Sequence, residues 1–175
     1  MSQEIEAIKG IIRDVPDFPK EGIIFKDIAP LLGDAELFSS CISLMAERVR
    51  ESGATKVAVL DARGFIFGAA IADRLEIGFI PIRKAGKLPY KTRSVSYDLE
   101  YGSNTIEMHT DALDPGEKVA IVDDLLATGG TAVAAVELLL DAGADLVGAY
   151  FCLELGFLEG RKPLEQIYVD SLIVY

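Results

Sequence analysis

Two adjacent acids stand immediately before a glycine-rich stretch in the segment VDDLLATGGT. They are Asp123 and Asp124, and the apolar run at residues 119–122 that precedes them predicts a buried strand. The loop after them offers backbone N–H groups, two hydroxyls and the start of an apolar helix; it comprises Ala127, Thr128, Gly129, Gly130 and Thr131. A helix N-terminus with closely approaching backbone suits a phosphate group. The segment therefore predicts a phosphate site.

The acid pair narrows the class of ligand. Asp123 and Asp124 would repel a bare phosphate, so we expect them to face sugar hydroxyls or a hydrated magnesium ion. No lysine follows the loop, which excludes the nucleoside triphosphate P-loop. The combination indicates a sugar phosphate. The alternative is that the acids are turn and capping residues and the glycines only allow a tight strand-to-helix turn.

A basic cluster is the second group of residues with chemical potential. It comprises Arg83, Lys84, Lys87, Lys91 and Arg93 and is dense for so acidic a chain. An anionic ligand would explain it, and so would a solvated loop whose lysines protect a sheet edge. Acids and tyrosines follow in the same segment, namely Tyr97, Asp98, Glu100 and Tyr101. Together they predict a lid that excludes water from a reaction.

The hydrophobic pattern predicts the elements that must position these residues. Asp34 caps a helix that ends at Gly53. Further predicted elements are a strand at 57–60, a helix at 64–75, a strand at 78–84, the strand at 119–122, a helix at 131–141 and strands at 146–153 and 167–174. Residues 84–102 read as a long loop with a ragged hairpin formed by RSVSYDLE and NTIEMHT.

Non-alternating apolar strands interleaved with helices predict an α/β fold with a mainly parallel sheet of right-handed crossovers. Ligands in such sheets bind beyond the carboxyl ends of the strands, where the acid pair lies. A length of 175 residues predicts a single domain, and the composition is that of a folded protein.

Composition and charge exclude several classes of partner. A net charge of -11, from 28 acids and 17 bases, argues against nucleic-acid binding. The N-terminal residues lack a signal-peptide pattern and no apolar run is long enough to span a membrane, so we expect a soluble, cytoplasmic protein. Cys41 and Cys152 have no metal or redox spacing and read as reduced core residues. We assign no chemistry to His109.

Four segments carry a resemblance to a known family. IVDDLLATGGT resembles the phosphoribosyl pyrophosphate signature of the type I phosphoribosyltransferases, and DDLLATGGT is similar to the form found in adenine phosphoribosyltransferases. PDFPKEGIIFKDIAPLL, DARGFIFG, and RKAGKLP with YDLEYG match those enzymes in order and spacing. The resemblance implies the type I fold with a small N-terminal hood at 1–33 and a flexible lid loop at 84–105. It implies transfer of phosphoribose from phosphoribosyl pyrophosphate to adenine, with Mg²⁺, by a homodimer.

The resemblance also implies roles for individual residues. Asp123 and Asp124 would hold the ribose hydroxyls, and residues 127–131 would bind the 5′-phosphate. The pyrophosphate ligands would be Asp61, Ala62, Arg63, Arg83, Lys84 and Lys87. Cations there would stabilise the leaving group. No protein ligand of the metal is certain, because Mg²⁺ would be bound mainly through substrate and water near the acid pair.

The resemblance also implies which residues bind adenine and which transfer a proton. Phe25 and Leu125 would sandwich adenine, with the backbone of Ile24 reading its edge and Arg63 also touching the base. Glu100 would act as acid or base and Tyr101 would close the lid beside it. Bland alternatives remain open: Phe25 as core, Glu100 as a solvated side chain and Arg63 as a cap or ion-pair partner. Lys26 stands where many members carry arginine, so bidentate pairing there is in doubt.

Two alternative functions remain open. They are a 6-oxopurine phosphoribosyltransferase and a non-catalytic module that senses phosphoribosyl pyrophosphate.

The predicted helix at 131–141 carries only Glu137 and Asp141 as charges, so nearly every face of it must be covered. Because the sheet covers one side only, we expect a partner surface, most simply that of a symmetric homodimer.

Overall fold

The computed structural model describes residues 2–98 and 103–175 and divides the chain into two compact units, residues 1–44 and 45–175. The first unit contains helix α1 (Ser2–Ile11), strands β1 (Arg13–Pro16) and β2 (Ile24–Asp27) and helix α2 (Ala29–Gly33). Helix α3 (Ala35–Glu51) crosses the division between the units. The prediction of one domain with a hood at 1–33 stays a prediction.

The first unit is built on an antiparallel hairpin of β1 and β2. Lys26 Nζ lies 2.6 Å from Asp14 Oδ1, and Arg13 contacts Asp27 at the same distance. Lys26, at the position where many family members carry arginine, therefore forms an ion pair with Asp14. The predicted capping by Asp34 is confirmed, since its Oδ1 accepts hydrogen bonds from the backbone N–H groups of Glu36 and Leu37 at the start of α3.

The second unit is a seven-stranded sheet with flanking helices. Its elements are β3 (Lys56–Leu60), α4 (Gly64–Leu75), β4 (Gly78–Lys84), β5 (Thr92–Asp98), β6 (Ser103–His109), β7 (Lys118–Leu126), α5 (Gly130–Asp141), β8 (Asp145–Glu154), the short 3₁₀ helices η1 (Gly156–Leu158) and η2 (Lys162–Leu164), and β9 (Val169–Val174). The strand order is β5-β6-β4-β3-β7-β8-β9. The pairs from β4 through β9 are parallel, and β6 pairs antiparallel with both β4 and β5. The predicted α/β class with a mainly parallel sheet is confirmed.

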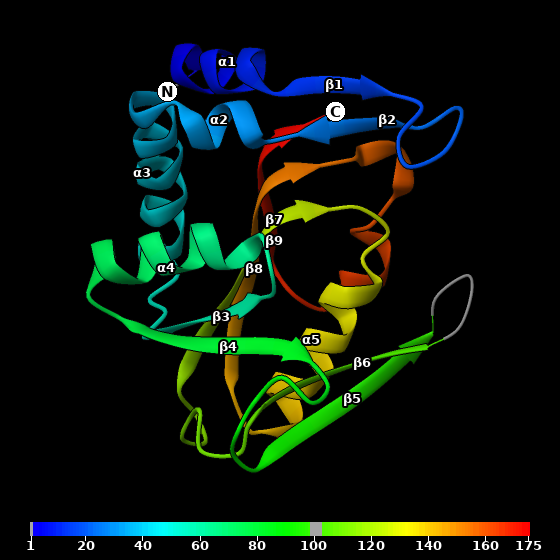
Figure 1. Cartoon of the computed structure of the whole chain (residues 1–175). Helices are drawn as coiled ribbons and strands as arrows, with labels where there is room; N and C mark the ends of the chain where they lie inside the picture. The colour runs from blue at the N-terminus through cyan, green and yellow to red at the C-terminus, as the bar shows by residue number, and fades with distance from the viewer. Residues whose placement is uncertain (1, 99–102) are drawn as a thin grey trace. The chain divides into compact units, whose positions relative to one another are not determined.

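The crossovers explain where a ligand site can form. The chain runs from β3 through α4 to β4 on one side, and from β7 through α5 to β8 on the other side (Figure 1). Because both crossovers of such parallel strands are right-handed, α4 and α5 cover opposite faces of the sheet. The strand order therefore reverses between β3 and β7, and the carboxyl ends of these two strands form a topological switch point.

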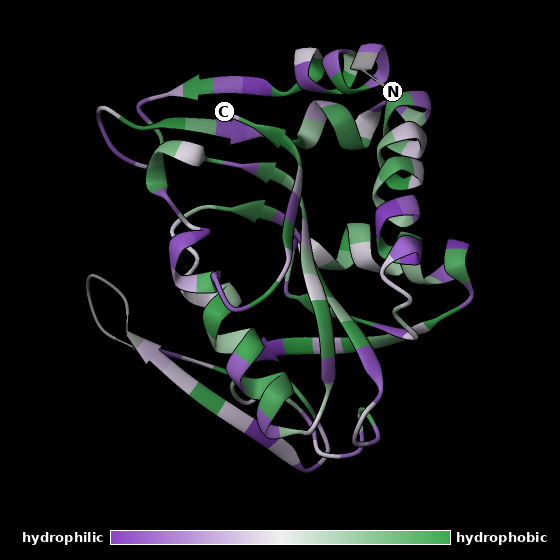
Figure 2. Ribbon diagram, turned by 180° about the vertical axis from the view of Figure 1, so that it is seen from behind, coloured by the Kyte–Doolittle hydropathy of each residue, from purple (hydrophilic) through white to green (hydrophobic). Residues whose placement is uncertain are grey.

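Helix α5 is covered by the chain itself. One side packs against β7 and β8, and the β5–β6 hairpin lies against it as well (Figure 1). Val95, Ile106 and Met108 of the hairpin belong to the same buried cluster as Ala135 and Leu139 of α5. Most of the α5 ribbon carries the hydrophobic colour in Figure 2. The premise that the sheet covers only one side of this helix is therefore wrong. The predicted partner surface stays a prediction, and the homodimer rests on the family resemblance.

Two further elements differ from the sequence-based expectation. Strand β7 continues through Asp123 and Asp124 to Leu126, since Asp123 pairs with Phe151 and Leu125 with Leu153 of β8. The hairpin predicted as ragged is regular, with continuous antiparallel pairing from Thr92 with His109 to Asp98 with Ser103. A local sequence pattern does not show how β7 pairs with β8 or how β5 pairs with β6, because the hydrogen bonds of a ladder join residues on different strands.

The remaining predictions about the chain concern membranes and cysteines. In the ranges that the structure describes, no helix is long and apolar enough to cross a bilayer. Cys41 and Cys152 are both buried and neither forms a disulfide, which confirms their interpretation as reduced core residues.

Candidate functional site

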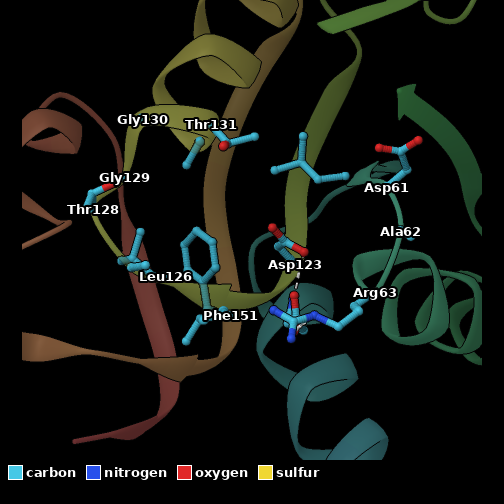
Figure 3. Close-up of a pocket in the computed structure, with 15 residues that line it drawn as sticks. Asp61, Ala62, Arg63, Asp123, Leu126, Thr128, Gly129, Gly130, Thr131 and Phe151 are labelled. Atoms are coloured by element: carbon cyan, nitrogen blue, oxygen red, sulfur yellow. Dashed lines mark hydrogen bonds and ion pairs between the residues drawn. The ribbon is translucent and has the colours of Figure 1, made fainter. Parts of the chain in front are cut away.

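A pocket of about 250 Å³ opens at the switch point between β3 and β7. Its lining combines the turn after β3, the end of β7, the loop before α5 and one side chain of β8. The lining residues are Leu60, Asp61, Ala62, Arg63, Asp123, Asp124, Leu125, Leu126, Ala127, Thr128, Gly129, Gly130, Thr131, Ala132 and Phe151. In the view of Figure 3, Asp123 lies between the turn with Asp61 and Arg63 and the loop with Thr128 and Gly129. Two segments about sixty residues apart in sequence thus share one site.

The two acids are held in different ways. Asp124 is 4% exposed, and its Oδ2 lies 2.8 Å from Arg63 Nε. Asp123 Oδ1 accepts a hydrogen bond of 2.8 Å from the backbone N–H of Asp124. A Cβ at Gly64 would lie only 2.5 Å from Asp123 Oδ1, so the absence of a side chain lets α4 begin beside this acid. The ion-pair interpretation of Arg63 is therefore the one observed here, and the direct contact is with Asp124 rather than with Asp123.

The electrostatics of the pair oppose full ionisation. Burial raises the pKa of Asp123 well above the usual carboxyl value, the charge of Asp124 raises it further, and Arg63 acts in the opposite direction. Burial also raises the pKa of Asp124, while Arg63 lowers it. Two neighbouring carboxylates with one shared cation are costly in a buried site. Such a pair is suited to ligand groups that donate hydrogen bonds, such as hydroxyls.

The loop at 127–131 reaches helix α5 through Gly129, whose φ of +87° is a backbone conformation that favours glycine. Gly129 is also the N-cap and supplies no side-chain acceptor, so the first N–H groups of α5 are open to an anion. A Cβ at Gly160 would lie 2.2 Å from the carbonyl oxygen of Ala127, and one at Gly129 would lie 2.4 Å from the oxygen of Gly160. The loop therefore rests directly on the backbone of the segment between η1 and η2.

The basic cluster lies beside this pocket rather than in its lining. Asp61 Oδ2 lies 3.2 Å from Arg83 Nε, which joins the turn after β3 to the end of β4. Lys84 and Lys87 are exposed, and neither lines the pocket. Arg93 donates to the carbonyl of Asp141, so this member of the cluster contacts the end of α5. The structure thus separates Arg83, next to the pocket, from lysines that face solvent.

The residues expected to bind the base fall in different parts of the chain. Leu125 lines the pocket. Ile24 is 53% exposed on β2, and Phe25 packs edge-on against Phe18 with ring centroids 5.3 Å apart. Both belong to the first unit, so the predicted sandwich of Phe25 and Leu125 stays a prediction. Glu100 and Tyr101 lie outside the described residues, and their predicted roles are likewise untested.

Sequence reasoning missed several contributors to the site. Phe151 lines the pocket from β8, but an apolar residue within an apolar strand carries no local signal of such a role. Tyr97 was named as a lid residue, but its contact was not foreseen: Tyr97 Oη lies 3.1 Å from Thr131 Oγ1 and so links the β5–β6 hairpin to the loop before α5. The close contact at Gly160 was not foreseen either, because Gly160 follows Gly129 by 31 positions without a shared motif.

Comparison with known proteins gives consistent results. The model of the phosphoribosyl transferase domain matches residues 32–169. An adenine phosphoribosyltransferase of Solidesulfovibrio magneticus is 55% identical over 166 residues, which cover 95% of this chain and 97% of that protein. The corresponding protein of Nitrosococcus oceani is 52% identical and covers 98% of this chain and all of its own length.

Solved structures agree with the sequence relatives. The crystal structure of adenine phosphoribosyltransferase from Thermoanaerobacter pseudethanolicus matches with a TM-score of 0.94 and 48% identity, over 98% of this chain and 99% of that one. The Saccharomyces cerevisiae enzyme, crystallised with an imino-altritol bisphosphate and adenine, matches with a TM-score of 0.92 and 37% identity. That match covers 98% of this chain and 99% of the yeast chain.

Proposed function

The chain belongs to the phosphoribosyl transferase family, and we propose that it transfers the 5-phosphoribosyl group from phosphoribosyl pyrophosphate to adenine, yielding AMP and pyrophosphate. The single observation that carries the proposal is the switch-point pocket, in which an acid pair adjoins an open helix N-terminus. Relatives more than 50% identical over almost the whole chain are adenine phosphoribosyltransferases, which supports adenine as the base. The reaction would serve purine salvage.

The ribose 5-phosphate half of the substrate would occupy the pocket. Asp123 would accept hydrogen bonds from the ribose 2′- and 3′-hydroxyls, because Arg63 contacts Asp124 directly and leaves the Asp123 side chain to the ligand. The 5′-phosphate would accept hydrogen bonds from the N–H groups of residues 127–131 and from the hydroxyls of Thr128 and Thr131. In this arrangement the hydroxyls face the carboxylates and the phosphate lies away from them.

The pyrophosphate would lie on the other side of the ribose. Residues 61–63 line that side of the pocket, and Arg83 is tied to Asp61. Lys84 and Lys87 would bring positive charge to the leaving oxygens as the bond from C1′ to pyrophosphate breaks. Their exposure leaves both ammonium groups available to a ligand.

Residues of both units, together with two residues outside the described ranges, would handle the base and the proton. Adenine would stack between Phe25 and Leu125, the backbone of Ile24 would read its edge, and Arg63 would contact both base and pyrophosphate. The new bond joins C1′ to an imidazole nitrogen of adenine, which must lose its proton. We propose that Glu100 accepts that proton, directly or through the purine ring, and that Tyr101 closes the lid.

Magnesium is expected to arrive with the substrate. Within the described ranges, no group of three or more His, Cys, Asp or Glu side chains forms a metal cage. Asp123 and Asp124 nevertheless offer carboxylate oxygens beside the pocket, and Mg²⁺ commonly binds one or two carboxylates together with waters and substrate phosphates. The residues therefore fit a substrate-bound Mg²⁺, which would neutralise charge on the pyrophosphate.

A purine panel tests the proposal. The protein is incubated with phosphoribosyl pyrophosphate, Mg²⁺ and adenine, hypoxanthine, guanine or xanthine, and pyrophosphate release is followed. We expect release with adenine far above the other bases. Preference for hypoxanthine or guanine would favour a 6-oxopurine enzyme, and binding of phosphoribosyl pyrophosphate without release would favour a sensing module. Cytoplasmic location and the homodimer stay predictions.

A further inference from the structure

A buried carboxylate lies outside the pocket and has no role in the reaction proposed above. Glu107 lies on β6 and is 6% exposed. Its Oε1 accepts hydrogen bonds from three consecutive backbone N–H groups, those of Gly86, Lys87 and Leu88, at 3.0, 3.2 and 3.3 Å. In the described part of the chain it has no ion-pair partner. One oxygen therefore holds three successive residues of the segment after β4.

Such an arrangement needs a physical reason, because burying a carboxylate is expensive unless its charge is satisfied by hydrogen bonds. Hydrogen bonds to an ionised acceptor are stronger than neutral ones, so three donors can offset that cost. These hydrogen bonds also fix the backbone of the three donor residues. Their segment would otherwise be an exposed turn with unpaired N–H groups.

The segment fixed by Glu107 carries the exposed lysines. The carbonyl of Lys87 accepts a hydrogen bond of 3.2 Å from Arg83 Nη1, and the N–H of Ala85 donates to the carbonyl of Thr105. The backbone of Lys87 is thus tied at both its N–H and its carbonyl. Arg83 in turn contacts Asp61 in the pocket lining. A continuous chain of contacts therefore runs from Glu107 through this turn to the pocket.

We propose that Glu107 is a positioning residue that holds the turn at 85–88 so that Lys84 and Lys87 meet the pyrophosphate in a preset arrangement. The inference rests on the proposed function, because it takes the pyrophosphate of phosphoribosyl pyrophosphate as the ligand of these lysines. Preorganised cations stabilise developing charge without reorganising during the reaction. The turn is accordingly a fixed element, and closure of a lid does not have to assemble it.

Three substitutions separate positioning from simple stability. Glu107→Met removes the acceptor and keeps the volume, whereas Glu107→Gln keeps a neutral carbonyl acceptor. We expect Glu107→Met to raise the KM for phosphoribosyl pyrophosphate and the inhibition constant of pyrophosphate by about tenfold or more, with the KM for adenine changed less than about twofold. Glu107→Gln should restore most of the affinity and leave a rise of about threefold in the KM for phosphoribosyl pyrophosphate. Ile106→Val, which shortens a core side chain on the same strand, should change none of these constants.

A double-mutant cycle tests the route through Lys87. If Glu107 acts by placing Lys87, Glu107→Met should weaken pyrophosphate binding less in a Lys87→Met background than in the wild type. Fully additive effects, or equal rises in the KM of both substrates, would overturn the proposal. Should Glu107→Met fail to fold, Glu107→Gln decides: a selective rise of about threefold in the KM for phosphoribosyl pyrophosphate supports the proposal and no rise overturns it. A wild-type protein without turnover would instead defeat the proposed function.

Discussion

The substitution Gly160→Ala adds one methyl group and tests how the loop at 127–131, which is proposed to bind the 5′-phosphate, is held in place. A Cβ there would lie 2.2 Å from the carbonyl oxygen of Ala127 and 3.2 Å from the backbone nitrogen of Gly129. Real Cβ atoms essentially never approach closer than 3.0 Å and ordinary van der Waals contact begins at 3.4 Å, so in Gly160→Ala the two backbones must separate by 0.8 Å (3.0 minus 2.2) to 1.2 Å (3.4 minus 2.2). Both contacts involve backbone, so no side chain can rotate away to relieve them.

The displacement sets the size of the expected effect. A misplacement of about 1 Å in groups that position a substrate can lower catalytic efficiency about 100-fold. At about 1.36 kcal/mol per tenfold, this corresponds to a loss of about 2.7 kcal/mol of transition-state stabilisation. We expect the loss in kcat/KM for phosphoribosyl pyrophosphate, because the shifted loop is the one proposed to bind its 5′-phosphate.

Initial rates of AMP formation at varied phosphoribosyl pyrophosphate measure the effect, and thermal unfolding reports whether the variant is folded. Gly33→Ala is the matched control, because a Cβ at Gly33 meets nothing within 4 Å. The control should stay within about twofold of the wild type, as exposed substitutions usually do. A folded Gly160→Ala protein with wild-type kcat/KM would refute the idea that this backbone contact positions the loop.

Three further predictions concern the acid pair, a buried ion pair and the assembly. Asp123→Asn should stabilise the ligand-free protein by about 1 kcal/mol while abolishing binding of phosphoribosyl pyrophosphate. Because the pKa of Asp123 is raised on folding, its favourable contribution is present below the usual carboxyl pKa and lost as pH rises through the raised value, so the gain measured by denaturant unfolding should grow with pH. Arg161→Met should lower the free energy of unfolding by about 2 kcal/mol at pH 7, since Glu154 is 4% exposed and loses the guanidinium that lies 2.7 Å from it. Burial raises the pKa of Glu154, but the hydrogen bonds from Arg161 bring it below its usual value. This stability is therefore present above the usual carboxyl pKa, and the deficit of the variant should shrink as pH falls through the lowered value. Light scattering at micromolar concentration should give the mass of two chains, and a monomer would remove the homodimer prediction.

Local patterns predicted most of the elements because each depends on residues close in sequence. Helix α4 begins and ends where the segment GFIFGAAIADRL does, and β4 coincides with GFIPIRK. The cap at Asp34 is a contact of two and three residues along the chain. Helix α1 was not foreseen, although it carries Glu4 in its first turn and Lys9 in its last.

The site was predictable in part. The acid pair and the glycine loop were identified from their residues and the turn at 61–63 from the family resemblance, and all three line one pocket. What the local pattern could not reveal is the state of each acid. Asp123 and Asp124 are adjacent in sequence, yet only Asp124 is paired with Arg63. That difference depends on where α4 begins relative to β7, which is a matter of packing.

The amino-acid sequence by itself determined the order and type of the elements and the chemistry that they can offer, because hydrophobic period, caps and glycine positions act over a few residues. The tertiary structure alone decided which of these segments meet. It brought the hairpin of β5 and β6 against α5, Gly160 under the loop at 127–131 and Glu107 onto the turn at 85–88. Each of these contacts joins residues that are distant in sequence, and their energies come from burial and from hydrogen bonds that exist only once the sheet has formed.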